Sequence, residues 1–203
     1  MSLIDRVVAA VTPPESEEKR REARAKARAA AGQNDWLAQV LDHHEQIESL
    51  FVGVRAAQDA RTRQEALKEL ALVLTGHANA EEAVIYPALV HFDHKVHGMA
   101  GYTEQAGAKA NMGELEYLDP MSSDFLDKLE HIRGAVAHHM YEEENDRFLD
   151  LKQISSGDQA RLTARYMEEF DRYVDSKDES ELEFGTTRPN VVEGETLKPG
   201  VVR

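Results

Sequence analysis

Apolar residues recur three and four positions apart between residues 35 and 152, and they nowhere alternate in the manner of a β-strand. The first stripe predicts a helix over residues 35–59 and consists of Trp36, Leu37, Val40, Leu41, Ile47, Phe51 and Val54. The same spacing predicts further helices over about residues 62–87, 98–118 and 123–153. Because most connections are short, the predicted fold class is all-α, with an antiparallel up-down four-helix bundle as its core.

Two pairs of residues suggest where helices begin. Thr62 and Glu65 form a capping-box pattern at the start of the second core helix. Ser156 and Gln159 form another, which predicts an additional helix that ends near residue 176.

Segments of different composition flank the predicted bundle. Residues 15–31 are rich in Ala, Arg, Lys and Glu but have almost no apolar stripe, which predicts an exposed helix or one that docks by its alanines. The last residues contain Gly and Pro with little periodicity and predict a flexible tail. The predicted parts are therefore an N-terminal helical extension (1–34), the bundle (35–152), an additional helix (153–177) and the tail (178–203).

Composition narrows the classes of partner and chemistry. The 203 residues include 38 acidic and 24 basic side chains, for a formal charge of −14. This balance argues against nucleic acid and anionic membranes as partners, because no net positive field attracts phosphate. The absence of cysteine excludes disulfides and thiolate sites, so a metal would need His, carboxylate or other O/N ligands. The chain has no apolar run of transmembrane length and a poor secretory signal, so we expect a cytoplasmic protein.

A histidine precedes a glutamate by four positions in three stretches, HEQIE, HANAE and HMYEE. On helical wheels, His44, His77 and His139 fall on the predicted core faces, and Glu81 and Glu143 follow their histidines one turn later. A single His–Glu pair at this spacing is commonly a surface pair worth about 0.2–0.5 kcal/mol. Three of them on the core faces of three helices favour a metal site, because buried carboxylates are costly unless a cation compensates them.

The sequence resembles the hemerythrin-like HHE cation-binding family in the stretches LDHHEQIESLF, HANAEEAVIYPAL and VAHHMYEEENDRF, which together cover the predicted bundle. The resemblance implies a four-helix bundle with a non-haem, usually di-iron, site and the ligand order H…HxxxE…H…HxxxE. It assigns the first-helix ligand to His44, the second-helix pair to His77 and Glu81, and the fourth-helix pair to His139 and Glu143. Both glutamates would bridge the metals. Members of the family are linked with oxygen, nitric oxide, peroxide or iron sensing and handling.

The third predicted helix departs from this order, because it contains no histidine and has Gln105 at the place where one is required. Three interpretations stay open. Gln105 ligates through its carbonyl oxygen, Glu48 supplies the missing ligand from one turn below His44, or Lys109 places an ammonium among the carboxylates and substitutes for one cation. The last would leave a single metal or none, unless Lys109 only extends to the end of the bundle.

Other polar residues are candidates for further roles. The motif HFDHKVH, with His91, His94 and His97, lies in a predicted irregular link and is either a second, exposed metal site or a polar loop. Tyr86, Tyr141 and Asp146 lie near the predicted ligand turns, so they are candidates for hydrogen bonds to the ligands.

The predicted function is that of a non-haem iron protein that senses or handles iron or a small oxidant (O2, peroxide or NO) in a stress response. The predicted cofactor is iron in a di-iron centre, with a mononuclear site or another divalent metal as alternatives. A different hypothesis is a metal-poor or metal-free regulatory bundle that acts through protein–protein interaction, supported by Gln105 and Lys109. A ferritin-like oxidase fits less well, because that class uses E-x-x-H pairs. The amphipathic helix ends are compatible with a homodimer.

Overall fold

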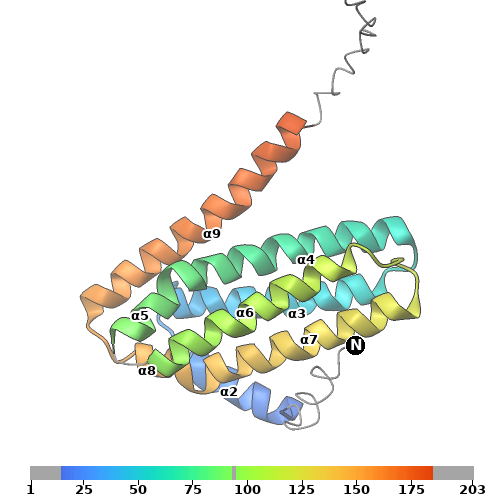
Figure 1. Cartoon of the computed structure of the whole chain (residues 1–203). Helices are drawn as coiled ribbons and strands as arrows, with labels where there is room; N and C mark the ends of the chain where they lie inside the picture. Colours follow the sequence, from blue (N-terminus) through green and yellow to red (C-terminus); the bar gives the residue numbers. More distant parts are fainter. Residues whose placement is uncertain (1–14, 93–94, 185–203) are drawn as a thin grey trace, which may run out of the picture.

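The computed structural model describes residues 15–92 and 95–184, without the side chains of residues 95–97 and 177–184, and every regular element in these residues is a helix (Figure 1). The all-α class is therefore confirmed for this part of the chain. The up-down order of the core helices and the four-part division of the chain stay predictions. No helix in the described residues combines the length and the apolar character needed to cross a membrane.

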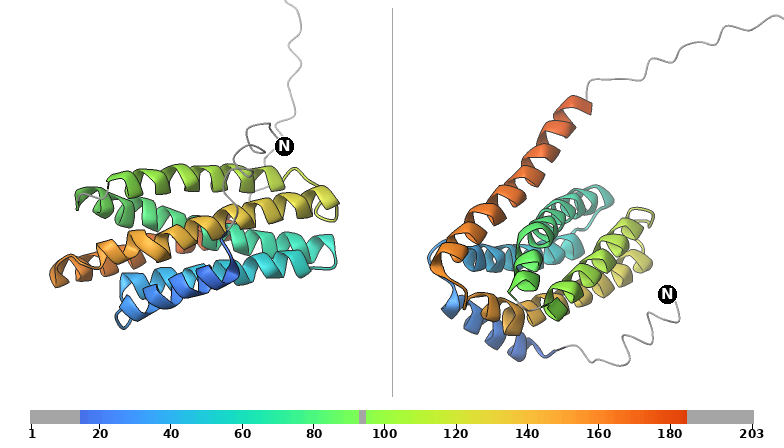
Figure 2. Two further views of the ribbon diagram at one scale, coloured as in Figure 1. Left: turned by 90° about the horizontal axis from the view of Figure 1, so that it is seen from below. Right: turned by 60° about the vertical axis from the view of Figure 1, so that its left-hand side comes forward.

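Four long helices form the body of the molecule and lie side by side (Figures 1 and 2). They are α3 (Trp36–Ala56), α4 (Ala60–Ala80), α6 (Lys95–Leu115) and α7 (Ser123–Glu142). Helix α3 packs against α4 and α7, and α6 packs against α7. These are the four core helices that the apolar stripes predicted, with ends shifted by a few residues.

Two of these helices are interrupted by a single π-helical turn. Helix α4 continues through η1 (Glu81–Ile85) into α5 (Tyr86–His91), and α7 continues through η2 (Glu143–Arg147) into α8 (Phe148–Leu151). A π turn contains an extra residue, because each N–H bonds to the carbonyl five positions earlier instead of four. A helical wheel drawn at 100° per residue therefore loses its register at both turns.

The second core helix runs to His91 and does not end near Pro87 as predicted. In a π turn the partner of the N–H at position 87 would be the carbonyl of Glu82, but proline has no N–H. The hydroxyl of Tyr102 on α6 donates to that carbonyl at 2.7 Å, so the helix can continue through the proline.

The same helix also begins earlier than predicted, because Asp59 caps it. The Asp59 carboxylate accepts the backbone N–H of Thr62 at 2.9 Å and the Thr62 hydroxyl at 2.8 Å. Thr62 is thus inside α4, and the capping box predicted for Thr62 and Glu65 is wrong.

Helix α2 (Glu17–Ala30) lies along the outside of the bundle, against α3, α7 and η2 (Figure 2). It docks through the buried residues Ala23 and Ala27, as one of the two predicted alternatives required. The small alanine side chains let α2 approach its neighbours closely. Such a close approach lets α2 pack although it has no apolar stripe.

Helix α9 (Ser156–Phe184) packs against α3 and α4 near its start and projects from the bundle toward its end (Figure 1). Ser155 accepts the backbone N–H of Asp158 at 3.2 Å, so the cap belongs to Ser155 and the predicted capping box of Ser156 is wrong. The helix also continues past its predicted end near residue 176. Tyr166, in its first half, is fully buried.

The interior of the bundle consists of two apolar clusters with a polar layer between them. One cluster contains Trp36, Leu37, Val40, Leu41, Val84, Ile85, Leu89, Phe148, Leu151 and Tyr166. The other contains Ile47, Phe51, Val54, Leu70, Leu74, Leu115, Phe125, Leu129, Ile132 and Met140. The predicted ligands His44 and His77 come between these two sets along α3 and α4, so the fold places them where water is excluded.

The cap of α3 makes a testable contribution to stability. Asp35 accepts the backbone N–H groups of Ala38 and Gly32 and pairs with Lys152. Replacing Asp35 by Ala should lower the free energy of unfolding by about 1–2 kcal/mol in urea denaturation. Asp42→Ala is a suitable control, because the Asp42 side chain is 66% exposed and should contribute about 0–1 kcal/mol.

The contribution of Asp35 should also depend on pH. Burial raises the pKa of Asp35, but Lys152 and the two N–H groups outweigh burial and hold the pKa below its usual value. The stabilisation is therefore present above the ordinary aspartate pKa and is lost as the pH falls through the lowered value. A difference between wild type and Asp35→Ala that stayed constant from pH 7 to pH 2 would contradict this account.

Candidate metal centre

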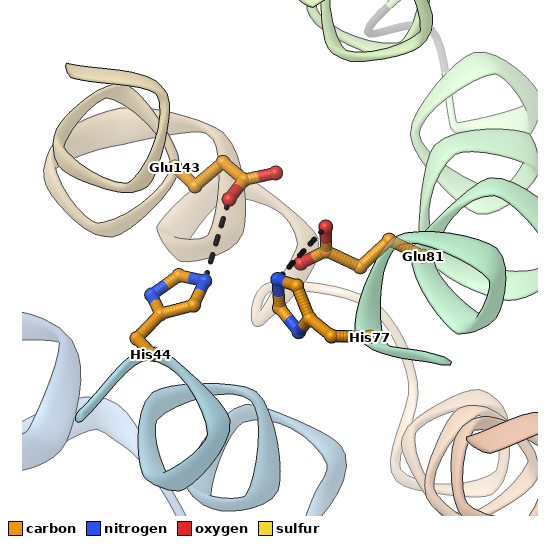
Figure 3. A group of neighbouring side chains, drawn as sticks. All are labelled: His44, His77, Glu81 and Glu143. Carbon is orange, nitrogen blue, oxygen red and sulfur yellow. Dashed lines mark ion pairs between the residues drawn. The ribbon is translucent and has the colours of Figure 1, made fainter. Parts of the chain in front are cut away.

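Four side chains with metal-binding groups meet in the polar layer between the apolar clusters. One ligand atom of each of His44, His77, Glu81 and Glu143 lies within 4.8 Å of all the others. They come from α3, α4, η1 and η2 and point toward one another (Figure 3). His77 is 2% exposed and the other three are 0% exposed, so the fold has brought two carboxylates and two imidazoles into one dry site.

Further polar groups lie close to the same two glutamates. The Tyr86 hydroxyl is 3.1 Å from Glu81 Oε2, 2.9 Å from Glu143 Oε1 and 3.2 Å from His139 Nε2. His139 Nε2 is also 3.3 Å from Glu143 Oε1. His139 thus joins the cluster through Glu143 and Tyr86.

The spacing of these atoms suits a small cation. With metal–ligand bonds of about 2.1 Å, neighbouring ligand atoms are about 3.0 Å apart in an octahedron and about 3.4 Å apart in a tetrahedron. The distances from Glu143 Oε1 to Tyr86 and His139, 2.9 and 3.3 Å, fall close to this range. The His77 Nε2 to Glu81 Oε2 distance of 3.3 Å does so as well.

Several polar atoms in this layer are buried without a hydrogen-bond partner among the described residues. They are His44 Nε2, Glu81 Oε1, Gln105 Oε1 and Glu143 Oε2. A buried polar atom without a partner costs about 1–3 kcal/mol, and more when it is charged. His44 Nε2 and Glu143 Oε2 form an ion pair at 3.5 Å without a hydrogen bond, and the four atoms together fit a site that a bound cation would complete.

Each of the three histidines is held by an outer partner at Nδ1. The partners are Glu144 for His44 at 2.8 Å, Tyr166 for His77 at 3.0 Å and Glu104 for His139 at 2.7 Å. Metal-binding histidines use one ring nitrogen for the metal and the other for such a partner. All three rings therefore leave Nε2 for the centre of the site.

Protons and a cation compete for these donors. Burial and the charge of Glu143 raise the pKa of Glu81 to about 8. Burial lowers the pKa of His44, but the pairs with Glu143 and Glu144 outweigh burial and raise the pKa to about 10. His77 has no carboxylate at Nδ1, and burial and the charge of His44 lower its pKa well below the usual value. A cation that binds at neutral pH thus displaces protons from Glu81 and His44.

Glu144 lies at the site, although the helical spacing singled out only its neighbour Glu143. It is 1% exposed and pairs with both His44 and Arg24, while its neighbour Glu143 faces the cluster. Adjacent residues of a regular helix point about 100° apart, and the π turn that begins at Glu143 changes this register. The signal in the sequence was only the run of three glutamates, Glu142 to Glu144.

Gln105 occupies the place that the family order reserves for the third-helix histidine. It is buried, and its amide nitrogen donates to Glu81 Oε2 at 2.5 Å and to the Tyr86 hydroxyl at 2.6 Å. Its carbonyl oxygen has no partner among the described residues. The structure thus brings Gln105 into the site, where its role as a ligand stays a prediction.

Glu48 and Lys109, the other two candidates for the missing ligand, lie outside the cluster. Glu48 has a 41% exposed side chain and pairs with Arg24 at 2.6 Å. Lys109 donates to Glu82 at 2.8 Å and to Asn79 at 3.0 Å. The Lys109 ammonium therefore does not lie among the buried carboxylates as one interpretation required.

The remaining candidates are away from the cluster or outside the described residues. His91 is exposed, and the side chains of His94 and His97 lie outside the described residues, so a second metal site there stays a prediction. Asp146 was a candidate for a hydrogen bond to a ligand. Its side chain is exposed and does not face the site. The shift again follows the π turn in which it lies.

Comparison with protein families matches residues 35–151 to the family described as Hemerythrin HHE cation binding domain. A helical protein with buried histidines and glutamates is what this match implies, and the matched residues make up more than half of the 203-residue chain. The chain therefore belongs to the hemerythrin HHE cation-binding family, which confirms the resemblance seen in the sequence.

A curated relative is named DNA nickase, from Nostoc sp. (strain PCC 7120 / SAG 25.82 / UTEX 2576). The two proteins are 27% identical over 121 residues, which are 60% of this chain and 34% of the relative. The chain thus spans about a third of the length of that protein. No solved structure matches the chain.

The contact between α6 and Tyr86 gives a test of the site. A Cβ atom at Gly101 would lie only 2.6–2.9 Å from carbons of the Tyr86 ring. Gly101→Ala should therefore displace the ring from the two glutamates, destabilise the protein by about 1–3 kcal/mol in urea and weaken metal binding.

Gly107, two turns later on the same helix, is the matched control. A Cβ atom there meets nothing within 4 Å, so Gly107→Ala should stabilise the helix by about 0.5–1 kcal/mol and leave metal binding unchanged. If both substitutions were equally harmless, the close packing on Tyr86 would not position the site.

Proposed function

We propose that this protein binds iron at His44, His77, Glu81, His139 and Glu143 and uses it to sense or handle a small oxidant. The observation that carries the proposal is the set of buried, unpartnered donor atoms that converge on the two glutamates. Imidazole together with carboxylate suits iron, manganese or zinc. Membership of the HHE family favours iron among these.

The two oxygens of Glu143 face different histidines, which supports a di-iron centre. Glu143 Oε2 is 3.5 Å from His44 Nε2, and Glu143 Oε1 is 3.3 Å from His139 Nε2. A carboxylate that presents its two oxygens to two different donors is suited to bridge two cations.

Bound iron would supply a redox-active centre that a small oxidant can reach. The surrounding residues exclude bulk water, since His44, Glu81 and Glu143 are 0% exposed and His139 is 8% exposed. A site this closed favours ligands of the size of O2, NO or peroxide over larger substrates. We propose such a molecule as the physiological ligand.

A metal-free regulatory bundle is a less favoured alternative. It was supported by Gln105 and Lys109, and Lys109 pairs with Glu82 and Asn79 instead of with the buried carboxylates. DNA nicking is likewise not proposed, because the chain covers 34% of the relative with that name and carries a net charge of −14.

Iron content tests the proposal directly. Protein loaded anaerobically with Fe²⁺ and freed of excess metal should contain about two iron atoms per chain by elemental analysis. Glu81→Gln should lower the content to about one atom or fewer, because it weakens a ligand that both positions share.

Glu82→Gln and Glu48→Gln are the matched controls, since both carboxylates lie outside the cluster and pair with Lys109 and Arg24. Both variants should keep the full iron content. Wild-type protein with fewer than about 0.5 iron atoms per chain would refute iron binding. A selective loss in Glu48→Gln would show instead that Glu48 is a ligand.

The oxidant can be tested with the iron-loaded, reduced protein. We expect O2, hydrogen peroxide or NO, added separately, to change the visible absorption spectrum within seconds to minutes. His139→Gln should reduce this change, since His139 is the least buried of the histidine ligands proposed. No spectral change with any of the three would contradict the oxidant proposal while leaving iron binding intact.

A further inference from the structure

Tyr166 reaches the site from outside the family domain. It lies on α9, beyond the matched residues 35–151, and its side chain is 0% exposed. Its hydroxyl is 3.0 Å from Nδ1 of His77 and 2.9 Å from Nδ1 of His43. Two imidazoles on different helices therefore share one phenol.

The number of protons restricts how this trio can be arranged. A phenol hydroxyl has one proton, so it donates to one histidine and accepts from the other when both Nδ1 atoms are in hydrogen-bond range. In the first order, Tyr166 donates to His77, whose own proton is then on Nε2. In the second order, His77 Nδ1–H donates to Tyr166, and Tyr166 donates to His43.

The two orders differ in what they leave for a cation. Nε2 of His77 faces the cluster, 3.3 Å from Glu81 Oε2. A histidine binds a metal through a nitrogen that carries no proton. Only the second order, with the proton of His77 on Nδ1, leaves the Nε2 lone pair available for the cation.

We propose that Tyr166 is a positioning residue that holds His77 in the tautomer with Nε2 free to bind the cation. The proposal rests on the proposed function, because it is metal binding that requires this tautomer. Helix α9 thereby becomes part of the metal site, although it lies outside the matched domain.

The rest of α9 supports the same geometry. Phe170, one turn after Tyr166, stacks on the ring of His43 with centroids 3.9 Å apart. A Cβ atom added at Gly76, next to His77, would be 3.2 Å from Tyr173 and 3.3 Å from Phe170. The ring of His43 and the backbone beside His77 are thus both packed against this one helix.

The partner of His77 at Nδ1 differs in kind from the partners of the other two histidines. His44 and His139 face carboxylates at Nδ1, and a carboxylate always accepts. Tyr166 can donate as well as accept, so its direction has to be decided by a third group. His43 is the third group within range, because its Nδ1 is 2.9 Å from the Tyr166 hydroxyl and accepts the phenol proton whenever that nitrogen carries none.

The first experiment compares Tyr166→Phe with Tyr117→Phe in the full chain. Both variants lose a phenol hydroxyl and keep the ring, but Tyr117 is 88% exposed and lies outside the cluster. Titration with Zn²⁺, a redox-inert probe, and anaerobically with Fe²⁺ should show binding about 10- to 100-fold weaker in Tyr166→Phe. Tyr117→Phe should stay close to wild type. Equal affinities for wild type and Tyr166→Phe would overturn the proposal.

The second experiment determines the tautomer of His77 in the metal-free protein. Protein labelled with ¹⁵N-histidine should show the His77 proton on Nδ1 in the wild type, with the signal assigned by its absence in His77→Gln. Tyr166→Phe should move the population toward the form with the proton on Nε2. A wild-type His77 with its proton on Nε2 would overturn the proposal. If the wild type bound neither metal, the proposed function would fail, while the tautomer would still decide the role of Tyr166.

Discussion

Two carboxylates buried in the middle of a helical bundle are the constraint on which the rest of this structure depends. Glu81 and Glu143 are 0% exposed, and each buried charge costs several kcal/mol unless neighbours compensate it. The surrounding polar residues supply that compensation in part, through the ion pair of Glu143 with His44, the contact of Glu81 with His77 and hydrogen bonds from Tyr86 and Gln105. Apolar clusters lie on both sides of the layer, so a proton or a metal ion is suited to complete the compensation. The fold is thus arranged to make a cation the favourable occupant.

The two π turns set the backbone geometry that places both glutamates in the site. Each begins at a buried glutamate, and each places one more residue in the turn than an α-helix would. After Glu143 the wider turn lets Glu144 reach His44 while Glu143 faces the cluster. After Glu81 it carries the chain through Pro87, with the Tyr102 hydroxyl replacing the missing backbone donor. The irregular turns therefore allow neighbouring residues to serve two layers of the same site.

The flanking helices belong to this arrangement, although the family match covers only residues 35–151. Helix α2 supplies Arg24, which pairs with Glu144 behind His44. Helix α9 supplies Tyr166 behind His77. Because these contacts orient the histidines, docking of the flanking helices and cation binding are thermodynamically linked, and each should favour the other. In this chain the surroundings of the site extend over more sequence than the ligands themselves.

The sequence by itself determined the helical class, the core faces and the histidines and glutamates that meet inside. Apolar spacing near His44 and His77 was enough for this, because regular helices keep their register over several turns. Only the tertiary structure decided the roles of Glu144, Glu104 and Tyr166 and the positions of Glu48 and Lys109. Glu144 depends on a π turn that no spacing rule indicates. The others depend on contacts between residues far apart in the chain, such as His77 and Tyr166, which are 89 positions apart. Local periodicity carries information about one helix at a time, whereas a metal site is completed by what neighbouring helices bring to it.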